Sequence, residues 1–266
     1  SDGSLLYSGN AGLTWEPQNT PTTTPLLDLA FIDPTIGFVV GGCIELPCEP
    51  GSGLILETYD SGETWSQVEL ASPVGTLNAI AFPSQNRGIV AGDEVVLTTG
   101  NGGTRWDVHP RPGEVFEDLW FESVERGYAV GRGGLIQVTE DSGETWTKVE
   151  TAHTGDLHAI AFSQGIGYLA GEDGLLRSFD EGFSWEQVEG APTGLHAVHF
   201  VDLDSGIVGG QGTSGALLAL TNDYGDNWLG GLDLDTVHSI RDFSFPNDDE
   251  GFAVGQGDQV IKLLRQ

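Results

Sequence analysis

Short apolar segments alternate with glycine-rich turns along the whole chain, and no stretch of 10 or more residues has the period of a helix. One kind of segment ends in Phe, at LLDLAF (26–31), LNAIAF (77–82), FEDLWF (116–121), LHAIAF (157–162), LHAVHF (195–200) and VHSIRDF (237–243), the last with one extra residue that predicts a bulge. A second kind is bracketed by glycines, at GFVVGG (37–42), GIVAG (88–92), GYAVG (127–131), GYLAG (167–171), GIVGG (206–210) and GFAVG (251–255). Short apolar runs bounded by turn residues predict buried strands.

A polar turn that ends in Trp recurs six times. The copies are SGNAGLTW (8–15), TYDSGETW (58–65), TGNGGTRW (99–106), TEDSGETW (139–146), SFDEGFSW (178–185) and TNDYGDNW (221–228), which we call the repeat turns. Their Asp or Asn can accept hydrogen bonds from backbone N–H groups a few residues on, their Gly supplies a positive φ, and their Trp packs as an apolar plug. We therefore expect a structural role for Asn10, Trp15, Asp60, Trp65, Asn101, Trp106, Asp141, Trp146, Asp180, Trp185, Asp223 and Trp228.

The segments combine into a unit of four strands. Strand A ends in Phe, strand B is bracketed by glycines, strand C resembles LILET (54–58), and strand D follows the Trp, as in WSQVEL (65–70). A four-stranded unit repeated about every 40 residues is typical of a β-propeller. We predict one all-β domain over residues 1–266, a propeller of six four-stranded antiparallel blades whose ring is closed by pairing of the N- and C-terminal strands. Seven blades are the alternative, because both Leu5–Ser8 and Val260–Leu264 fit strand C.

The charge of the chain restricts its partners. Acidic residues number 40 and basic residues 10, so the formal net charge is −30. Such a surface repels nucleic acid and anionic lipid, and it favours a basic partner, cations or a saline habitat. No apolar run approaches the ~20 residues needed to cross a membrane as a helix, so we expect no membrane insertion.

Cys43 and Cys48 lie five residues apart in CIELPCEPG. This spacing is neither a zinc quartet nor a redox CxxC, and it favours a local disulfide, with a free pair in a reducing cell as the alternative. A disulfide would place the protein in an oxidising compartment, which is secreted, periplasmic or lumenal. The chain has no Met, so Ser1 is expected to follow a removed signal peptide or an expression boundary.

The repeat turn resembles the Asp-box of the bacterial-neuraminidase-repeat propellers. The longer repeat FESVERGYAVGRGGLIQVTEDSGETWTKVE (121–150) resembles that of the photosystem II stability and assembly factor family, through GYAVG, GGLI and T-x-D-x-G-x-T-W in that order. This resemblance implies a lumenal or periplasmic propeller that acts as a non-enzymatic protein-binding assembly scaffold. The role of that family involves a cluster of arginines, whereas this chain has eight Arg in all, two of which, Arg87 and Arg126, precede strand B.

The Asp-box also occurs in sialidases and other glycoside hydrolases, so a carbohydrate-binding or sialidase-like propeller is the alternative function. A sialidase needs three arginines around the substrate carboxylate, a Tyr–Glu pair and an acid Asp. The arginines here occupy different repeat positions, and no FRIP-like segment or GxSxG motif is present. We therefore predict no enzyme activity and no catalytic residue.

Polar residues recur at the second position of strand A, where a buried strand would carry apolar ones. The six positions are Leu27, Asn78, Glu117, His158, His196 and His238. Equal positions in equal strands point alike, so we select Glu117, His158, His196 and His238 as a candidate binding site. Neutral imidazoles with a carboxylate could hold Zn²⁺, and a polar channel lining without metal is the alternative.

Two other features belong to the candidate function. Acidic loops at 171–174, 201–206 and 246–251 could bind Ca²⁺ but lack the spacing of an EF-hand, so we expect no obligatory cofactor. The predicted contact face for a protein partner carries the B-to-C turns and D-to-A connections, including the Cys43–Cys48 loop, the histidine positions of strand A and RPGEVF (111–116).

Overall fold

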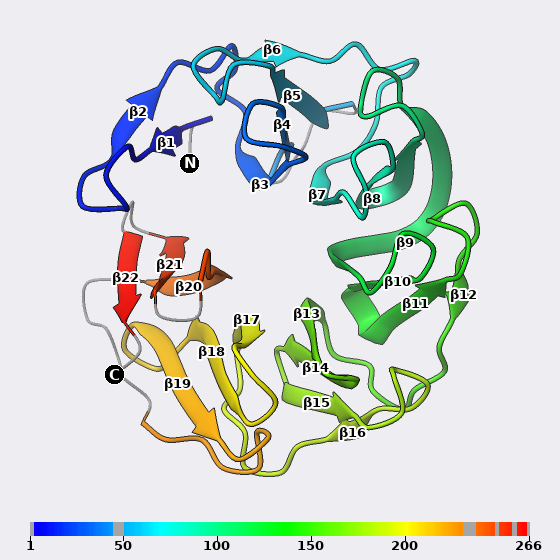
Figure 1. Cartoon of the computed structure of the whole chain (residues 1–266). Helices are drawn as coiled ribbons and strands as arrows, with labels where there is room; N and C mark the ends of the chain where they lie inside the picture. The colour runs from blue at the N-terminus through cyan, green and yellow to red at the C-terminus, as the bar shows by residue number, and fades with distance from the viewer. Residues whose placement is uncertain (1–2, 45–50, 231–237, 248–249, 257–259, 265–266) are drawn as a thin grey trace. The chain divides into compact units, whose positions relative to one another are not determined.

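The computed structural model describes residues 3–44, 51–230, 238–247, 250–256 and 260–264 (Figure 1). The described residues contain 22 strands and a single-turn 3₁₀ helix at Arg132–Gly134. No helix among them is long and apolar enough to span a bilayer. The chain divides into two compact units, Ser1–Ala129 with Gln137–Lys148 and Val130–Ile136 with Val149–Gln266.

Unit 1 contains three antiparallel sheets. β1 (Leu5–Tyr7) pairs with β2 (Glu16–Gln18). A second sheet follows the order β3 (Leu26–Phe31), β4 (Gly37–Gly41), β5 (Leu54–Thr58) and β6 (Ser66–Gln67). The third follows the order β7 (Leu77–Ala81), β8 (Gly88–Thr99), β9 (Asp107–Phe121), β10 (Gly127–Gly131), β11 (Leu135–Thr139) and β12 (Thr147–Lys148), and the boundary with unit 2 passes through β10 and β11.

Unit 2 contains three further sheets. The first has four strands, β13 (Leu157–Ser163), β14 (Ile166–Gly171), β15 (Gly174–Ser178) and β16 (Glu186–Gln187). The second has three, β17 (Leu195–Phe200), β18 (Ser205–Gln211) and β19 (Ala216–Asn222), and the third has β20 (Ser239–Ser244), β21 (Glu250–Gln256) and β22 (Val260–Leu264).

The strand order A, B, C is present in every repeat, but the prediction of six or seven four-stranded blades is wrong. The described residues form five sheets of three to six strands and the two-stranded β1–β2 sheet. Two repeats merge because β9 contains strand D of one repeat, paired with β8, and strand A of the next. Within the first of these repeats, β8 contains both strand B, paired with β7, and strand C, paired with β9. In the repeat of β17–β19, strand D is reduced to a bridge between Leu220 and Leu229.

Within the described residues β1 pairs with β2 and β22 pairs with β21, and the predicted closure of the ring by the N- and C-terminal strands stays a prediction. Both candidate C strands are therefore strands, each with a neighbour close in sequence. The single domain over residues 1–266 stays a prediction.

Hydrogen bonds within each repeat turn close it. In the turn that begins at Thr58, the Thr58 hydroxyl donates to Asp60 Oδ1 (2.8 Å) and accepts from the Gly62 amide (2.9 Å). Asp60 Oδ1 also accepts from the Thr64 amide (2.9 Å), and the Trp65 indole donates to the Gly62 carbonyl (3.1 Å). Two consecutive residues with positive φ reverse the chain, here Ser61 (65°) and Gly62 (87°), which explains the fixed Gly.

The Phe of strand A packs against the Trp of the same repeat. Five such pairs meet edge to face with ring centroids 5.9–6.5 Å apart, namely Phe31–Trp65, Phe82–Trp106, Phe121–Trp146, Phe162–Trp185 and Phe200–Trp228. The first glycine of strand B lies under the same Phe ring, so that a Cβ at Gly88 would lie 2.5 Å from Phe82. The spacing of Phe, Gly and Trp along the chain thus reflects one packed contact.

Two arginines join neighbouring repeats within a unit. In unit 1, Arg87 donates to the Ser142 carbonyl (Nε, 2.9 Å) and to Glu144 (2.8 Å) in the next repeat turn. In unit 2, Arg177 donates to the Tyr224 carbonyl (3.0 Å) and to Asp226 (2.6 Å). The acceptor carbonyl belongs each time to the positive-φ residue before the turn Gly, and the carboxylate to the residue after that Gly. These contacts give both arginines a structural role, because they link neighbouring repeats.

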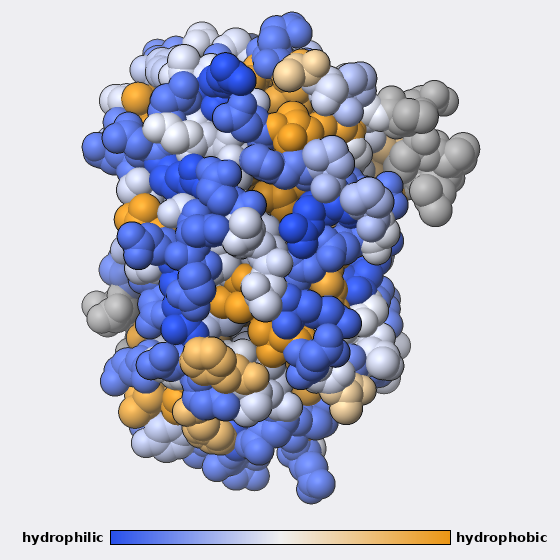
Figure 2. Space-filling model, turned by 90° about the vertical axis from the view of Figure 1, so that its right-hand side faces the viewer, coloured by the Kyte–Doolittle hydropathy of each residue, from blue (hydrophilic) through white to orange (hydrophobic). Residues whose placement is uncertain are grey.

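The surface seen in Figure 2 is mainly hydrophilic, with apolar side chains in small separate groups. This distribution agrees with the excess of acidic residues.

Candidate functional site

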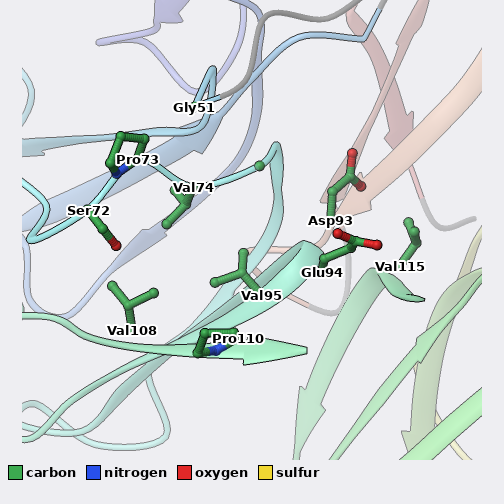
Figure 3. A pocket seen from close by; sticks show the side chains of 11 residues that line it. Gly51, Ser72, Pro73, Val74, Asp93, Glu94, Val95, Val108, Pro110 and Val115 are labelled. Carbon is green, nitrogen blue, oxygen red and sulfur yellow. The ribbon is translucent and has the colours of Figure 1, made fainter. Parts of the chain in front are cut away.

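A pocket lies in unit 1 where connecting segments from successive repeats meet. Its cavity of about 580 Å³ is lined by Gly51, Ser72, Pro73, Val74, Gly75, Asp93, Glu94, Val95, Val108, Pro110 and Val115 (Figure 3). Gly51 follows the cysteine loop, residues 72–75 are a D-to-A connection, and Asp93 and Glu94 link strands B and C within β8. The pocket thus lies among the segments from which the sequence predicts a contact face.

An irregularity in β9 shapes one wall of the pocket. Val95 pairs with Pro110 and Asp93 pairs with Val115, so residues 111–114 lie outside the regular ladder. Arg111 Nε donates to Glu114 Oε2 (2.6 Å), and Gln137 Nε2, from a buried side chain, donates to Glu114 Oε1 (2.6 Å). A bulge whose polar groups are paired in this way holds a fixed wall.

The floor is apolar and the rim is acidic. Val74 and Val95 are almost fully buried, at 6% and 4% exposure, and Val108 and Val115 are half-buried. Asp93 is half-buried and Glu94 is exposed. An apolar concavity with a few placed polar groups is the usual form of a binding site.

Specific hydrogen bonds orient both rim carboxylates. Asn78 Nδ2 donates to Asp93 Oδ1 (3.3 Å) and to the Phe116 carbonyl (2.7 Å). Glu94, at a φ of 58°, accepts from the Gly113 amide (3.0 Å) through Oε1. Neither carboxylate pairs with a Lys or Arg in the part of the chain that the structure describes.

The second position of strand A is a β-bulge in five sheets. The pairing register skips Leu27, Asn78, His158, His196 and Arg241, each of which is the second residue of its strand A. A bulge leaves its residue outside the ladder, which explains why polar side chains occur there. Glu117 lies in β9, half-buried, in the other unit from the histidines.

The alignment of His238 with His158 and His196 is wrong. The register of β20 on β21 places Arg241 at the bulge, and the ring under which Gly251 fits is that of Phe245 rather than Phe243. Strand A of the last repeat is therefore IRDFSF (240–245), and His238 is an exposed residue before it. The sequence contains two Phe residues two positions apart, and the second of them, rather than the first, takes the place of the strand-A Phe over the strand-B glycine.

His158, His196 and Arg241 come together in unit 2. The two imidazole centroids lie 4.8 Å apart, and Arg241 Nη1 lies 3.4 Å from His196 Nδ1. Burial, the Arg241 charge and His158 lower the pKa of His196 to about 4, so this imidazole is neutral at pH 7.

The described residues contain no group of three or more His, Cys, Asp or Glu side chains placed to hold a metal ion. A guanidinium beside His196 also disfavours a divalent cation.

In the acidic loop 201–206, Asp202 and Asp204 accept from Ser205 (both 2.8 Å), and the loop 246–251 lies partly outside the described residues. Cys48 is also outside them, so the Cys43–Cys48 bond stays a prediction.

Sequence reasoning missed the arginine contacts of Arg87 and Arg177 and the pocket itself. An acidic residue directly after the turn Gly, as at Glu144 and Asp226, could have suggested an arginine partner. The pocket depends on the irregular pairing of β9, for which the only sequence signal is the Pro-Gly pair within residues 111–114.

A family model described as "Photosynthesis system II assembly factor YCF48" matches residues 8–111 and 108–198, more than two thirds of the 266-residue chain. The chain belongs to this family. It is 29% identical over 131 residues to the chloroplast photosystem II stability/assembly factor HCF136 of Arabidopsis thaliana, covering 46% of this chain and 30% of that protein. It is also 26% identical over 255 residues to a xyloglucanase of Hypocrea jecorina, covering 85% of this chain and 28% of that protein.

The chain spans about half or less of the curated relatives that it matches, from 28% to 51% of their length. Among solved structures it resembles "YCF48 bound to D1 peptide" (TM-score 0.52, 19% identity, 92% of this chain and 93% of that chain). An ancestral GH74 enzyme resembles it with a TM-score of 0.70 at 13% identity, over 89% of this chain and 36% of that chain. Both likenesses support the propeller fold.

Proposed function

We propose that this protein is a non-enzymatic propeller that binds a polypeptide partner and acts as an assembly scaffold. The observation that carries the proposal is the family match across residues 8–198. In one of the similar solved structures YCF48 is bound to D1 peptide, and this ligand of the related protein supports a polypeptide partner here.

A narrower form of this proposal has photosystem II as the source of the partner. The arginines weaken this form, because those named below already make contacts within the chain. Arg87 and Arg177 join repeats, and Arg111 is held by Glu114. With a net charge of −30, the chain suits a partner with a basic surface rather than an acidic one.

The alternative is a carbohydrate-binding or hydrolytic propeller, favoured by the xyloglucanase match over 85% of the chain. A glycosidase needs two carboxylates roughly 5–10 Å apart at a substrate cleft. With 40 acidic residues in the chain, such a pair has little diagnostic value. Release of reducing sugar from xyloglucan by the purified protein would support this alternative and contradict the scaffold.

The proposed function is tested by affinity purification of the tagged chain from membranes of its native host after mild crosslinking. We expect reproducible capture of polypeptides of one membrane-protein assembly intermediate, which an excess of untagged protein abolishes. Capture that the untagged protein does not compete, or no capture at all, would contradict the scaffold role.

We propose further that the repeat turns are Asp-boxes and that the protein works in an exported, oxidising compartment with Cys43 and Cys48 bonded. Two curated relatives, from Picosynechococcus and Synechococcus, are named photosystem II assembly lipoproteins, which supports export. Alkylation of the native, unreduced protein should add no mass at either cysteine, whereas two alkylated thiols would refute the bond.

A further inference from the structure

The pocket of unit 1 provides three features together: an apolar floor, an acidic rim and fixed walls. We propose that it binds an extended peptide segment that places an aliphatic side chain on the valine floor and an adjacent Lys or Arg against Asp93 and Glu94. This inference names the chemistry of the partner and rests on the proposed function.

The floor selects the aliphatic group. Val74, Val95, Val108 and Val115 present branched apolar side chains, and Pro110 adds to this lining (Figure 3). Burying one aliphatic side chain against such a surface is favourable because it removes apolar area from water. At about 580 Å³, the cavity lies within the ~300–1,000 Å³ range of small-ligand sites, so it has room for part of a peptide.

The rim selects the cation. Asp93 and Glu94 each use one oxygen for a hydrogen bond to Asn78 or Gly113, which fixes the carboxylate and leaves its second oxygen for a ligand. In the described part of the chain, no Lys or Arg neutralises either group. A half-buried carboxylate such as Asp93 gains from a cationic partner, and the whole surface attracts one from a distance.

The walls are fixed before any ligand arrives. The Gly53 amide donates to the Val74 carbonyl (3.1 Å), and the Asp93 amide donates to the Thr76 carbonyl (2.8 Å). Arg111, Glu114 and Gln137 hold the opposite wall. A preformed site loses little conformational entropy on binding.

The test uses the full chain and three capped probes, acetyl-Gly-Leu-Lys-Leu-Gly-amide and its counterparts with Glu or Gln in place of Lys. Titrations are followed by amide chemical shifts of the ¹⁵N-labelled protein. We expect the Lys peptide to shift Val74, Gly75 and Val95 and to bind more tightly than the Gln peptide, with the Glu peptide weakest. Equal affinities for the three peptides, or shifts confined to other segments, would overturn the proposal.

Two variants locate the interaction. Asp93→Asn with Glu94→Gln removes both charges but keeps a side-chain oxygen for each hydrogen bond, and it should weaken the Lys peptide about three- to tenfold without changing the Gln peptide. Glu63→Gln with Glu69→Gln changes the net charge equally at exposed positions of the same unit and should have no effect. Ser72→Trp, at an exposed lining residue, should fill the pocket and abolish binding of both peptides.

The outcomes separate this inference from the proposed function. If the host partner is captured equally by the wild type, the Asp93→Asn/Glu94→Gln variant and Ser72→Trp, the pocket proposal fails and the scaffold role stands. If the Lys peptide binds at the pocket but the chain captures no host partner, the pocket stands and the scaffold role fails.

Discussion

In each repeat turn, one side-chain oxygen of the Asp or Asn accepts two hydrogen bonds, from the Ser or Thr hydroxyl before it and from the backbone amide four residues on. In the turn that begins at Thr139, Asp141 Oδ1 accepts from the Thr139 hydroxyl (2.9 Å) and from the Thr145 amide (2.8 Å), and Oδ2 accepts from the Thr145 hydroxyl (2.6 Å). The Trp that follows differs in burial between turns. Trp106 is 4% exposed and lies against Phe38 and Phe82, whereas Trp15 is 37% exposed.

This difference leads to a matched pair of substitutions. Trp106→Ala should lower the free energy of unfolding by about 3–5 kcal/mol, because it removes a buried ring and leaves a cavity. Trp15→Ala, in the same sequence context, should cost less than about 1 kcal/mol. Urea denaturation measures both, and equal losses would show that burial does not decide the role of this Trp.

The turn carboxylates predict an acid-sensitive fold. Hydrogen bonds from the Thr, Ser or Asn side chain four residues on, with others from backbone amides, lower the pKa of Asp60, Asp141, Asp180 and Asp223. The unfolded chain then binds more protons near pH 4, so this stabilisation is full above the ordinary Asp pKa of about 3.9 and is lost as pH falls through the lower folded values.

The melting temperature should therefore fall on acidification below about pH 4, with a slope that the four Asp→Asn substitutions reduce. The turn at Asn101, where a carboxamide oxygen accepts from the Arg105 amide (3.0 Å), shows that Asn fits this position. An unchanged slope in the quadruple variant would mean that other carboxylates cause the acid sensitivity.

At the scale of elements, repetition explains what the sequence could predict. The Phe, Gly and Trp spacings recur because each unit must make the same packed contact, so strands such as β3 and β5 have the predicted bounds. Irregular features do not recur and leave little signal. Strands B and C form one strand, β8, which runs through Asp93 and Glu94 without a break. Two candidate Phe residues near β20 explain why the pattern predicts His238 at the bulge that Arg241 occupies.

The arginine contacts are also element-scale features, and they can be tested. Arg177 joins its repeat to the next through Tyr224 and Asp226, and it lies 4.4 Å from the Phe179 ring. Tyr168, whose pKa burial raises to about 12, donates to the same Tyr224 carbonyl (3.0 Å).

Arg177→Met should lower the free energy of unfolding by about 1–3 kcal/mol, because the Tyr224 carbonyl and Asp226 lose a charged donor. Arg105→Met is the control, since Arg105 is 77% exposed and pairs with exposed Asp107, and it should change stability by less than about 0.5 kcal/mol. Thermal denaturation compares the two, and an equally small effect at Arg177 would contradict a role in joining repeats.

At the scale of the whole molecule, the boundary between the two units passes inside two strands, β10 and β11. Tyr128 therefore belongs to unit 1, and Val130, two residues on in the same strand, belongs to unit 2. A strand cannot lose half of its ladder at no cost, since the freed backbone groups must find other partners. We therefore expect the two units to unfold together, as the single domain over residues 1–266 requires.

Scanning calorimetry of two variants tests this expectation. Tyr128→Ala removes a fully buried side chain from unit 1, and Tyr168→Ala removes one from unit 2. In a cooperative molecule both should lower the same single transition, with equal calorimetric and van't Hoff enthalpies in the wild type. If instead each substitution moves a different one of two transitions, the units fold independently and the single-domain prediction is wrong. The Tyr128→Ala transition should then be the one that peptide binding at the pocket of unit 1 shifts upward, because a ligand stabilises only the folding unit that binds it.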